Sequence, residues 1–214
     1  YQAAALNVTR DASTPASALV AANNTVKTAS YKFEAQNDTY TLVKLQFDIT
    51  DATNVTSVNL KHGSTILQTQ PAAASVVFTG FAPALTVESG TPKILDVELV
   101  LGAVGAGAGT SGANIAVDFN GGASLVRPAS TGQVAASPDA VTGNAIYVQK
   151  SYPTITGIAL DTNGEKLVAG DRTLLKFKVS SNGDAIAWNK LIIGVTKTAA
   201  NTIADGARLI DSAT

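Results

Sequence analysis

The chain of 214 residues is 45% hydrophobic and only 14% charged, with a formal net charge of −1; such a near-neutral chain, without a basic stripe, is not expected to bind nucleic acid. It contains no cysteine, which excludes disulfides, thiolate nucleophiles and cysteine-ligated metals. No apolar run approaches the roughly 18 residues that span a bilayer, so no membrane span is expected in this segment.

Apolar and polar residues alternate in several segments of the chain, and this alternation predicts β-strands. The first clear strand places four residues on one face: Ala29, Tyr31, Phe33 and Ala35. The next strand does the same with Val43, Leu45, Phe47 and Ile49. Residues 95–101 and 115–119 repeat the pattern. We expect these faces to form a core, because burying one large apolar side chain contributes roughly 1.5–3 kcal/mol.

Turn residues separate the predicted strands about every 8–12 residues, a spacing typical of β-sandwiches. No segment has the pattern of an amphipathic helix, so the strands should pair mainly antiparallel. Residues 102–112 are rich in glycine and predict a long hairpin loop, and residues 124–141 predict a surface excursion. The fold class expected is therefore all-β, an antiparallel immunoglobulin-like sandwich.

A weak internal repeat divides the chain into two units. Short matches recur in order at offsets of 144 to 148 residues: Lys32-Phe33 with Lys176-Phe177, Lys44-Leu45 with Lys190-Leu191, Ile49-Thr50 with Val195-Thr196, and Leu19-Val20-Ala21 with Leu167-Val168-Ala169. Ala5-Leu6-Asn7 also parallels Ala159-Leu160-Asp161 at a larger offset. We predict one sandwich over residues 1–150 and a second, partial or small one over residues 151–214.

Residues 151–214 are too few for a second unit of the same size. Three interpretations remain open: the natural chain continues, the second domain is smaller, or a neighbouring subunit supplies the missing strands. Continuation of the chain is the interpretation that we favour.

The order of strand and turn motifs resembles the repeated β-sandwich units of large bacterial surface proteins, including S-layer and filament proteins and those of candidate-phyla bacteria. The resemblance lies in a series of short segments: Leu19-Val20-Ala21, Lys32-Phe33, Val58-Asn59-Leu60 with Gly63, Val77-Phe78-Thr79-Gly80-Phe81, and Leu85-Thr86-Val87 with Gly90-Thr91-Pro92-Lys93. It implies display on the cell surface and assembly, and it carries no catalytic residues to this chain.

The chain offers few groups for catalysis. His62, the single histidine, precedes Gly63 in a predicted turn, and no Gly-x-Ser-x-Gly elbow accompanies it. The glycines of residues 105–109 lack the helix and the lysine of a phosphate loop. Asp96 and Glu98 share the solvent face of a strand, as in an ordinary solvated strand. We therefore predict no catalytic residues and no enzyme activity.

Calcium is the one cofactor that the sequence leaves open. Asp161, Asn163 and Glu165 flank Gly164, but the spacing matches an EF-hand loop only in part and the distal glutamate is missing. The turn Asn182-Gly183-Asp184 is a similar, equally weak candidate. A plain turn is the favoured interpretation at both places, and no bound cofactor is expected.

Four Asn-x-Thr sequons make Asn7, Asn23, Asn37 and Asn54 candidate glycosylation sites. A carbohydrate-binding platform of aromatic residues is the alternative to core packing, and packing is favoured because most of these residues fall on core faces: Phe33, Phe47, Phe78, Phe119 and Phe177. Trp188 is expected in the core or at the domain joint, although Leu191, Ile193 and Val195 have the opposite parity and Trp188 could therefore face a partner.

Together these features predict an extracellular structural subunit of a surface assembly (an S-layer, pilus-like filament or stalk) that self-associates into a homo-oligomer or polymer. Residues 1–9, with Leu6 and Val8 alternating, are the candidate donor strand for a neighbour. The alternative is a cell-surface adhesin or carbohydrate-binding module.

Overall fold

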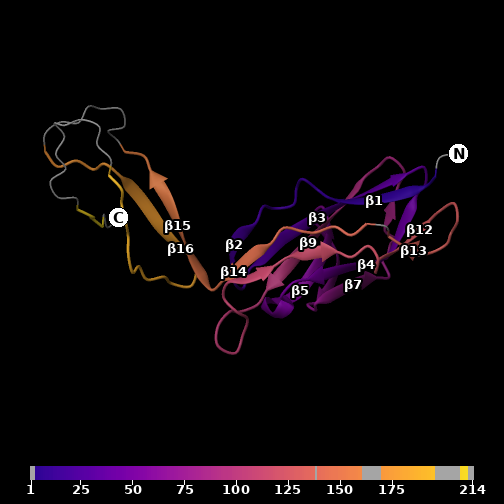
Figure 1. The fold of residues 1–214 in the computed structure, drawn as a ribbon, viewed down its shortest axis with the longest axis horizontal. Helices are drawn as coiled ribbons and strands as arrows, with labels where there is room; N and C mark the ends of the chain where they lie inside the picture. The colour runs from indigo at the N-terminus through magenta and orange to yellow at the C-terminus, as the bar shows by residue number, and fades with distance from the viewer. Residues whose placement is uncertain (1–2, 138, 161–169, 196–207, 212–214) are drawn as a thin grey trace.

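A computed structural model describes residues 3–137, 139–160, 170–195 and 208–211 (Figure 1). In these ranges the regular elements are strands, apart from one 3-10 turn, η1 (Ala52–Asn54). The same ranges contain no helix that is long and apolar enough to cross a membrane. The prediction of an all-β chain is confirmed.

The first sheet has five antiparallel strands. Their order across the sheet is β1 (Ala5–Arg10), β3 (Thr25–Gln36), β9 (Lys93–Leu101), β5 (Val55–His62) and β6 (Thr65–Pro71). The turn from β3 to β4 uses Asn37 at φ 60°, and the β5–β6 hairpin uses Gly63 at φ 58°. Asparagine and glycine tolerate this left-handed backbone, and the turn predicted at His62 and Gly63 forms there.

The second sheet is built around β4 (Tyr40–Ile49). One edge of β4 pairs with β11 (Val117–Phe119) and β12 (Leu125–Pro128), and the other edge pairs with β7 (Ser75–Thr79) and β8 (Thr86–Val87). The short β13 (Ala135–Ala136) extends this sheet beyond β12. All these pairings are antiparallel, as expected for strands joined without crossover helices.

A third, small sheet contains β10 (Ala113–Ile115), β14 (Ile146–Gln149) and β2 (Ala18–Ala21). Here β14 pairs with β2 in parallel, an exception to the predicted antiparallel pattern. Residues 102–112 lead from β9 in the first sheet to β10 in this one, so the predicted hairpin loop is instead a connection between sheets.

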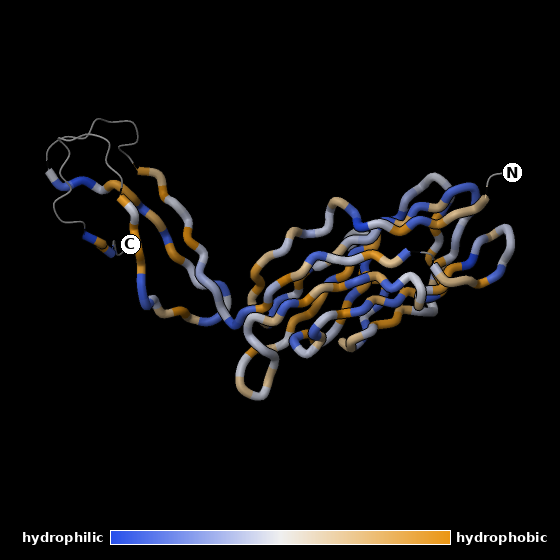
Figure 2. The backbone as a smooth tube through the Cα atoms, viewed as in Figure 1, coloured by the Kyte–Doolittle hydropathy of each residue, from blue (hydrophilic) through white to orange (hydrophobic). Residues whose placement is uncertain are grey.

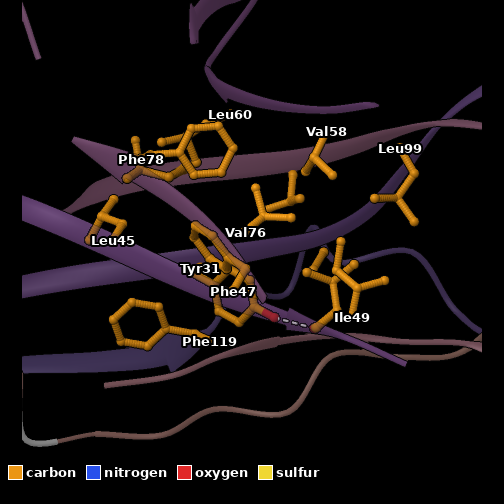
Figure 3. Packing of buried hydrophobic residues seen from close by; sticks show 14 of the residues in the cluster. Tyr31, Leu45, Phe47, Ile49, Val58, Leu60, Val76, Phe78, Leu99 and Phe119 are labelled. Atoms are coloured by element: carbon orange, nitrogen blue, oxygen red, sulfur yellow. Dashed lines mark hydrogen bonds between the residues drawn. The ribbon is translucent and has the colours of Figure 1, made fainter. Parts of the chain in front are cut away.

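Hydrophobic and hydrophilic residues follow one another along the strands of the sandwich (Figure 2). The apolar side chains of the two larger sheets meet in one continuous core (Figure 3). Tyr31, Phe33, Phe47, Phe78 and Phe119 are each at most 1% exposed. Their ring centroids lie 5.5–6.0 Å apart in tilted and edge-to-face pairs. Aromatic pairs at such distances contribute about 0.5–1.5 kcal/mol each beyond their burial. The predicted faces of residues 29–35 and 95–101 are confirmed as core faces.

The predicted face of β4 is wrong at one residue. Val43 is only half-buried, whereas Leu42 is 1% exposed. The register against β12 shifts here, because Leu125 lies opposite Lys44 and the next residue, Val126, lies opposite Leu42. The extra residue forms a β-bulge. Even-numbered residues therefore point into the core before the bulge, and odd-numbered residues point into it after the bulge. Simple alternation from residue 43 onward therefore missed the buried Tyr40 and Leu42.

A separate antiparallel pair follows the third sheet. It consists of β15 (Ser151–Ile158) and β16 (Lys176–Gly183), with Ser151 opposite Gly183 and Ile158 opposite Lys176. Its first strand begins two residues after Gln149, the end of β14. Figure 1 shows this pair beyond the end of the sandwich at which β14 lies.

Candidate functional site

Residues 139–144 lie between the edge strands β1 and β11 and contact both of them. The sequence did not identify this segment. The Asp139 carboxylate accepts a hydrogen bond of 2.7 Å from the N–H of Val8. Val141 exchanges backbone hydrogen bonds of 2.8 and 3.0 Å with Phe119. The first contact occupies one backbone donor at the outer edge of β1, and the second pairs Val141 with the edge of β11.

Leu6 and Val8, the candidate donor strand, belong to β1. Their side chains are 2% and 3% exposed, and β1 pairs with β3 of the same chain. A strand lent to a neighbour would have to leave its own core first. The structure therefore gives β1 a role inside the sandwich, and deletion of residues 1–9 would remove two core side chains.

A shallow groove of about 410 Å³ lies beside β1, between its first residues and β12–β13. Ala4, Tyr40, Val126 and Pro128 contribute to its lining. Its charged lining residue is Asp139, whose carboxylate already accepts the Val8 hydrogen bond. Tyr40 is the other titratable group among the described lining residues, and burial raises the pKa of its hydroxyl.

Asn54 fastens the glycine-rich connection of residues 102–112. Its amide nitrogen donates to the Thr110 carbonyl at 2.7 Å, and its amide oxygen accepts from the Thr110 N–H at 2.8 Å. A Cβ atom on Gly109 would lie 2.3 Å from that oxygen, so only glycine fits there. The predicted loop is thereby held by a buried side chain, and no helix follows its glycines as a phosphate site requires.

The four sequon asparagines differ in accessibility. Asn7, Asn23 and Asn37 are exposed, and Asn37 also donates a hydrogen bond of 3.0 Å to the Ala3 carbonyl. Asn54 is 0% exposed. Its amide nitrogen, the atom that would carry a glycan, is enclosed and hydrogen-bonded. In the folded protein Asn54 is therefore not a suitable acceptor, which the sequon alone could not reveal.

The outer face of the first sheet carries the acidic pair Asp96 and Glu98. Asp96 lies 3.4 Å from Lys27, and Glu98 lies 2.6 Å from Lys61. The carboxylates are paired with lysines from neighbouring strands, as on an ordinary charged face. His62 is exposed at the β5–β6 turn, and its Nδ1 lies 2.9 Å from the Ile94 carbonyl. The structure brings neither carboxylate together with the histidine in a catalytic arrangement.

The candidate calcium ligands are placed only in part. Asp161, Asn163 and Glu165 lie outside the described residues. In the second candidate, Asn182 donates to Thr154 Oγ1 at 2.5 Å, and Asp184 pairs with Lys150 at 3.3 Å. Among the residues that the structure describes, no group of three or more acidic or histidine side chains could hold a metal ion.

Strand β6 is the other end of the five-stranded sheet, and it lacks the charges that commonly protect a sheet edge. Its seven residues, Thr-Ile-Leu-Gln-Thr-Gln-Pro, include no lysine or glutamate. Ile66 is 51% exposed. An uncharged edge strand of this length offers unpaired backbone groups to another strand.

The joint between the sandwich and the β15–β16 pair is short and tightly packed. Lys150 is the single residue between β14 and β15. Its N–H donates to Ser111 Oγ at 3.3 Å, and its ammonium pairs with Asp184 at 3.3 Å. A Cβ on Gly183 would lie 2.4 Å from the Lys150 carbonyl oxygen. The two parts are therefore connected without a flexible linker.

Comparisons with known proteins identify no relative by sequence: no family model and no curated protein matches the chain. A family 123 glycoside hydrolase from Clostridium perfringens resembles the structure with a TM-score of 0.37 at 6% identity, over 67% of this chain and 27% of the hydrolase chain. The chain thus spans about a quarter of that protein.

Two further solved structures resemble the chain as weakly. One is a chain of the CaDoc0917–CaCohA2 complex, with a TM-score of 0.36 at 14% identity, over 67% of this chain and 100% of that chain. The other is AvmM, described as catalysing macrocyclization in alchivemycin A biosynthesis, with a TM-score of 0.33 at 9% identity, over 86% and 90%. These likenesses carry no argument about function.

Proposed function

We propose that the chain is an extracellular structural subunit of a cell-surface assembly, such as an S-layer, a pilus-like filament or a stalk, built from tandem immunoglobulin-like sandwich units. The observation that carries this proposal is the joint at Lys150, where one β-structure passes into the next through a single residue. Units joined in this way transmit position and tension along the chain, which suits a scaffold.

The surface chemistry supports a structural role over an enzymatic one. The chain is poor in charged residues. On the outer face of the first sheet, Asp96 and Glu98 form ion pairs with lysines. The groove beside β1 has its carboxylate committed to a backbone N–H. Catalysis needs a group held ready for the substrate, and this part of the chain commits its polar groups to internal contacts.

Self-association would proceed by pairing at the edge of β6. Asp139 occupies one backbone donor of the β1 edge, whereas β6 ends its sheet with an uncharged strand. Addition of a strand from a second copy would satisfy the backbone groups of this edge and extend the sheet between subunits.

Sedimentation velocity of two lysine variants tests the proposal. Ile66→Lys places a charge on the exposed edge strand and should abolish concentration-dependent oligomers without unfolding the chain. Ile94→Lys is the matched control, because Ile94 is 36% exposed but lies on β9 inside the sheet; it should assemble as the unmodified chain does. A chain that stays monomeric at every concentration would contradict the proposal, as would equal assembly of both variants.

A further inference from the structure

When β16 is aligned on β3 through Lys32-Phe33 and Lys176-Phe177, its partner β15 corresponds to β1. Two cross-strand pairs in each show the correspondence: Val8–Phe33 and Leu6–Ala35 in the first, Gly157–Phe177 and Ile155–Val179 in the second. Phe177 and Val179 follow Phe33 and Ala35 by 144 residues. By this register, the residue equivalent to Leu6 is Ile155. The internal repeat in the sequence had instead matched Leu6 with Leu160.

The two pairs differ in what covers them. The shared face of β1 and β3 is a core face, on which Leu6 is 2% and Phe33 is 0% exposed. On the corresponding face of β15 and β16, Ile155 is 61% exposed and Phe177 is half-buried. This second face therefore carries large apolar side chains that remain partly or largely exposed to solvent.

In the first unit, part of the cover is β4 with its bulge. Five side chains of β4 point into the core at 6% exposure or less: Tyr40, Leu42, Leu45, Phe47 and Ile49. The residues 146 positions further along are all large and apolar: Ile186, Trp188, Leu191, Ile193 and Val195. Asn189 takes the place of the bulge residue Val43.

A bulge would explain how Trp188 can share a face with Leu191, although three positions separate the two residues. On a plain strand Trp188 would point away from Leu191, just as Leu42 would point away from Leu45. In β4 both leucines are buried, because the extra residue at Val43 shifts the register between them. The same arrangement around Asn189 would bring Trp188 onto the inner face.

We propose that residues 186–195 form a bulged strand equivalent to β4 that covers the Ile155–Phe177–Val179 face of β15–β16 and places Trp188 in the core of a second sandwich. In the structure these residues form no strand, and Trp188, Ile193 and Val195 are 45–61% exposed. The proposed strand removes this apolar surface and that of β15–β16 from water together. The proposal rests on the β15–β16 register, the bulge of β4 and the spacing of 146 residues; it deepens the tandem-sandwich part of the proposed function and is independent of the self-association proposed above.

Trp188 is the single tryptophan, so its fluorescence reports directly on the proposed packing. In the full chain we expect blue-shifted emission, weak quenching by iodide at every protein concentration, and slow hydrogen exchange over residues 186–195. Emission and quenching of a solvent-exposed tryptophan with fast exchange would overturn the proposal. Burial that appears only at high concentration would also overturn it, since a second copy would then be the cover.

Two pairs of variants sharpen the test. Phe177→Ala should raise iodide quenching of Trp188 several-fold, whereas Lys178→Ala on the opposite face of β16 should not change it. Deletion of Asn189 should leave Trp188 buried, because removal of the extra residue gives a plain strand on which Trp188 and Leu191 lie two positions apart and share a face; Asn189→Ala keeps the chain length and should also leave Trp188 buried. If residues 186–195 form a plain strand without a bulge, Trp188 is exposed in the unmodified chain, and the deletion lowers its quenching by bringing it into phase with Leu191; that result would overturn the proposal.

Discussion

At the scale of single residues, buried polar side chains fix the parts of the chain that alternation cannot specify. Tyr31 lies in the aromatic core (Figure 3), and its hydroxyl donates a hydrogen bond of 2.5 Å to the Val117 carbonyl. Burial is the main cause that raises the pKa of this hydroxyl, and the charge of Asp118 adds to it. Asn54 likewise fixes the connection between β9 and β10, through two hydrogen bonds to the backbone of Thr110.

Asn54→Ala should therefore loosen that connection. Loss of the two hydrogen bonds leaves Thr110 backbone groups without these partners, which costs about 1–3 kcal/mol of unfolding free energy. Urea unfolding measures the loss, and hydrogen exchange should rise over residues 102–112. The control Asn7→Ala alters an exposed side chain and should stay within about 0.5 kcal/mol of the unmodified chain. Equal effects of the two substitutions would contradict the role given to Asn54.

Asp48 gives the fold a dependence on acid. Burial alone would raise its pKa, but hydrogen bonds from Ser75, Asn120 and Gln46 together lower it below the ordinary value of 3.8. Because the folded chain holds this proton less tightly than the unfolded chain, the contribution is complete above about pH 4 and is lost as the pH falls through the folded pKa.

Asp48→Asn should flatten the acid dependence of stability. Between neutral pH and about pH 3, the unfolding free energy of the unmodified chain should fall more steeply than that of the variant. Urea unfolding at a series of pH values gives both curves. Parallel curves would show that the three hydrogen bonds do not lower the pKa of Asp48.

At the scale of elements, alternation was a good guide wherever a strand pairs without interruption. It predicted the inward faces of β3 and β9 and the inward residues Leu45, Phe47 and Ile49 of β4. It failed at Val43 because a bulge is fixed by the register with β12, a strand about 80 residues away, and local sequence carries little of that information. Parallel pairing of β14 with β2 was missed for the same reason.

Deletion of Val43 tests the bulge. Without the extra residue, Leu42 and Leu45 lie two positions apart and share a face, so Tyr40 and Leu42 should stay in the core on a plain strand. The deletion should therefore cost little more than the control Val43→Ala, which keeps the bulge and shortens a half-buried side chain. A loss of about 3–6 kcal/mol on deletion alone, as expected if two large side chains left the core, would show that Val43 is not the extra residue.

At the scale of the whole molecule, the contacts of the sheet edges could not be predicted from the sequence. The segment of residues 139–144 reads as a loop, and only the fold brings Asp139 to the N–H of Val8. For this reason the sequence indicated β1 as the strand to lend, whereas the structure commits it to its own sheet. The candidate sequons needed the structure too, since the burial of Asn54 depends on residues 102–112.

The short joint at Lys150 and the uncharged edge of β6 are the observations behind our proposal that the chain polymerises through its sheets. Negative-stain electron microscopy of the purified native protein tests this claim most directly. We predict filaments or sheets whose repeat matches stacked β-sandwich units. Dispersed single particles at all concentrations would contradict it.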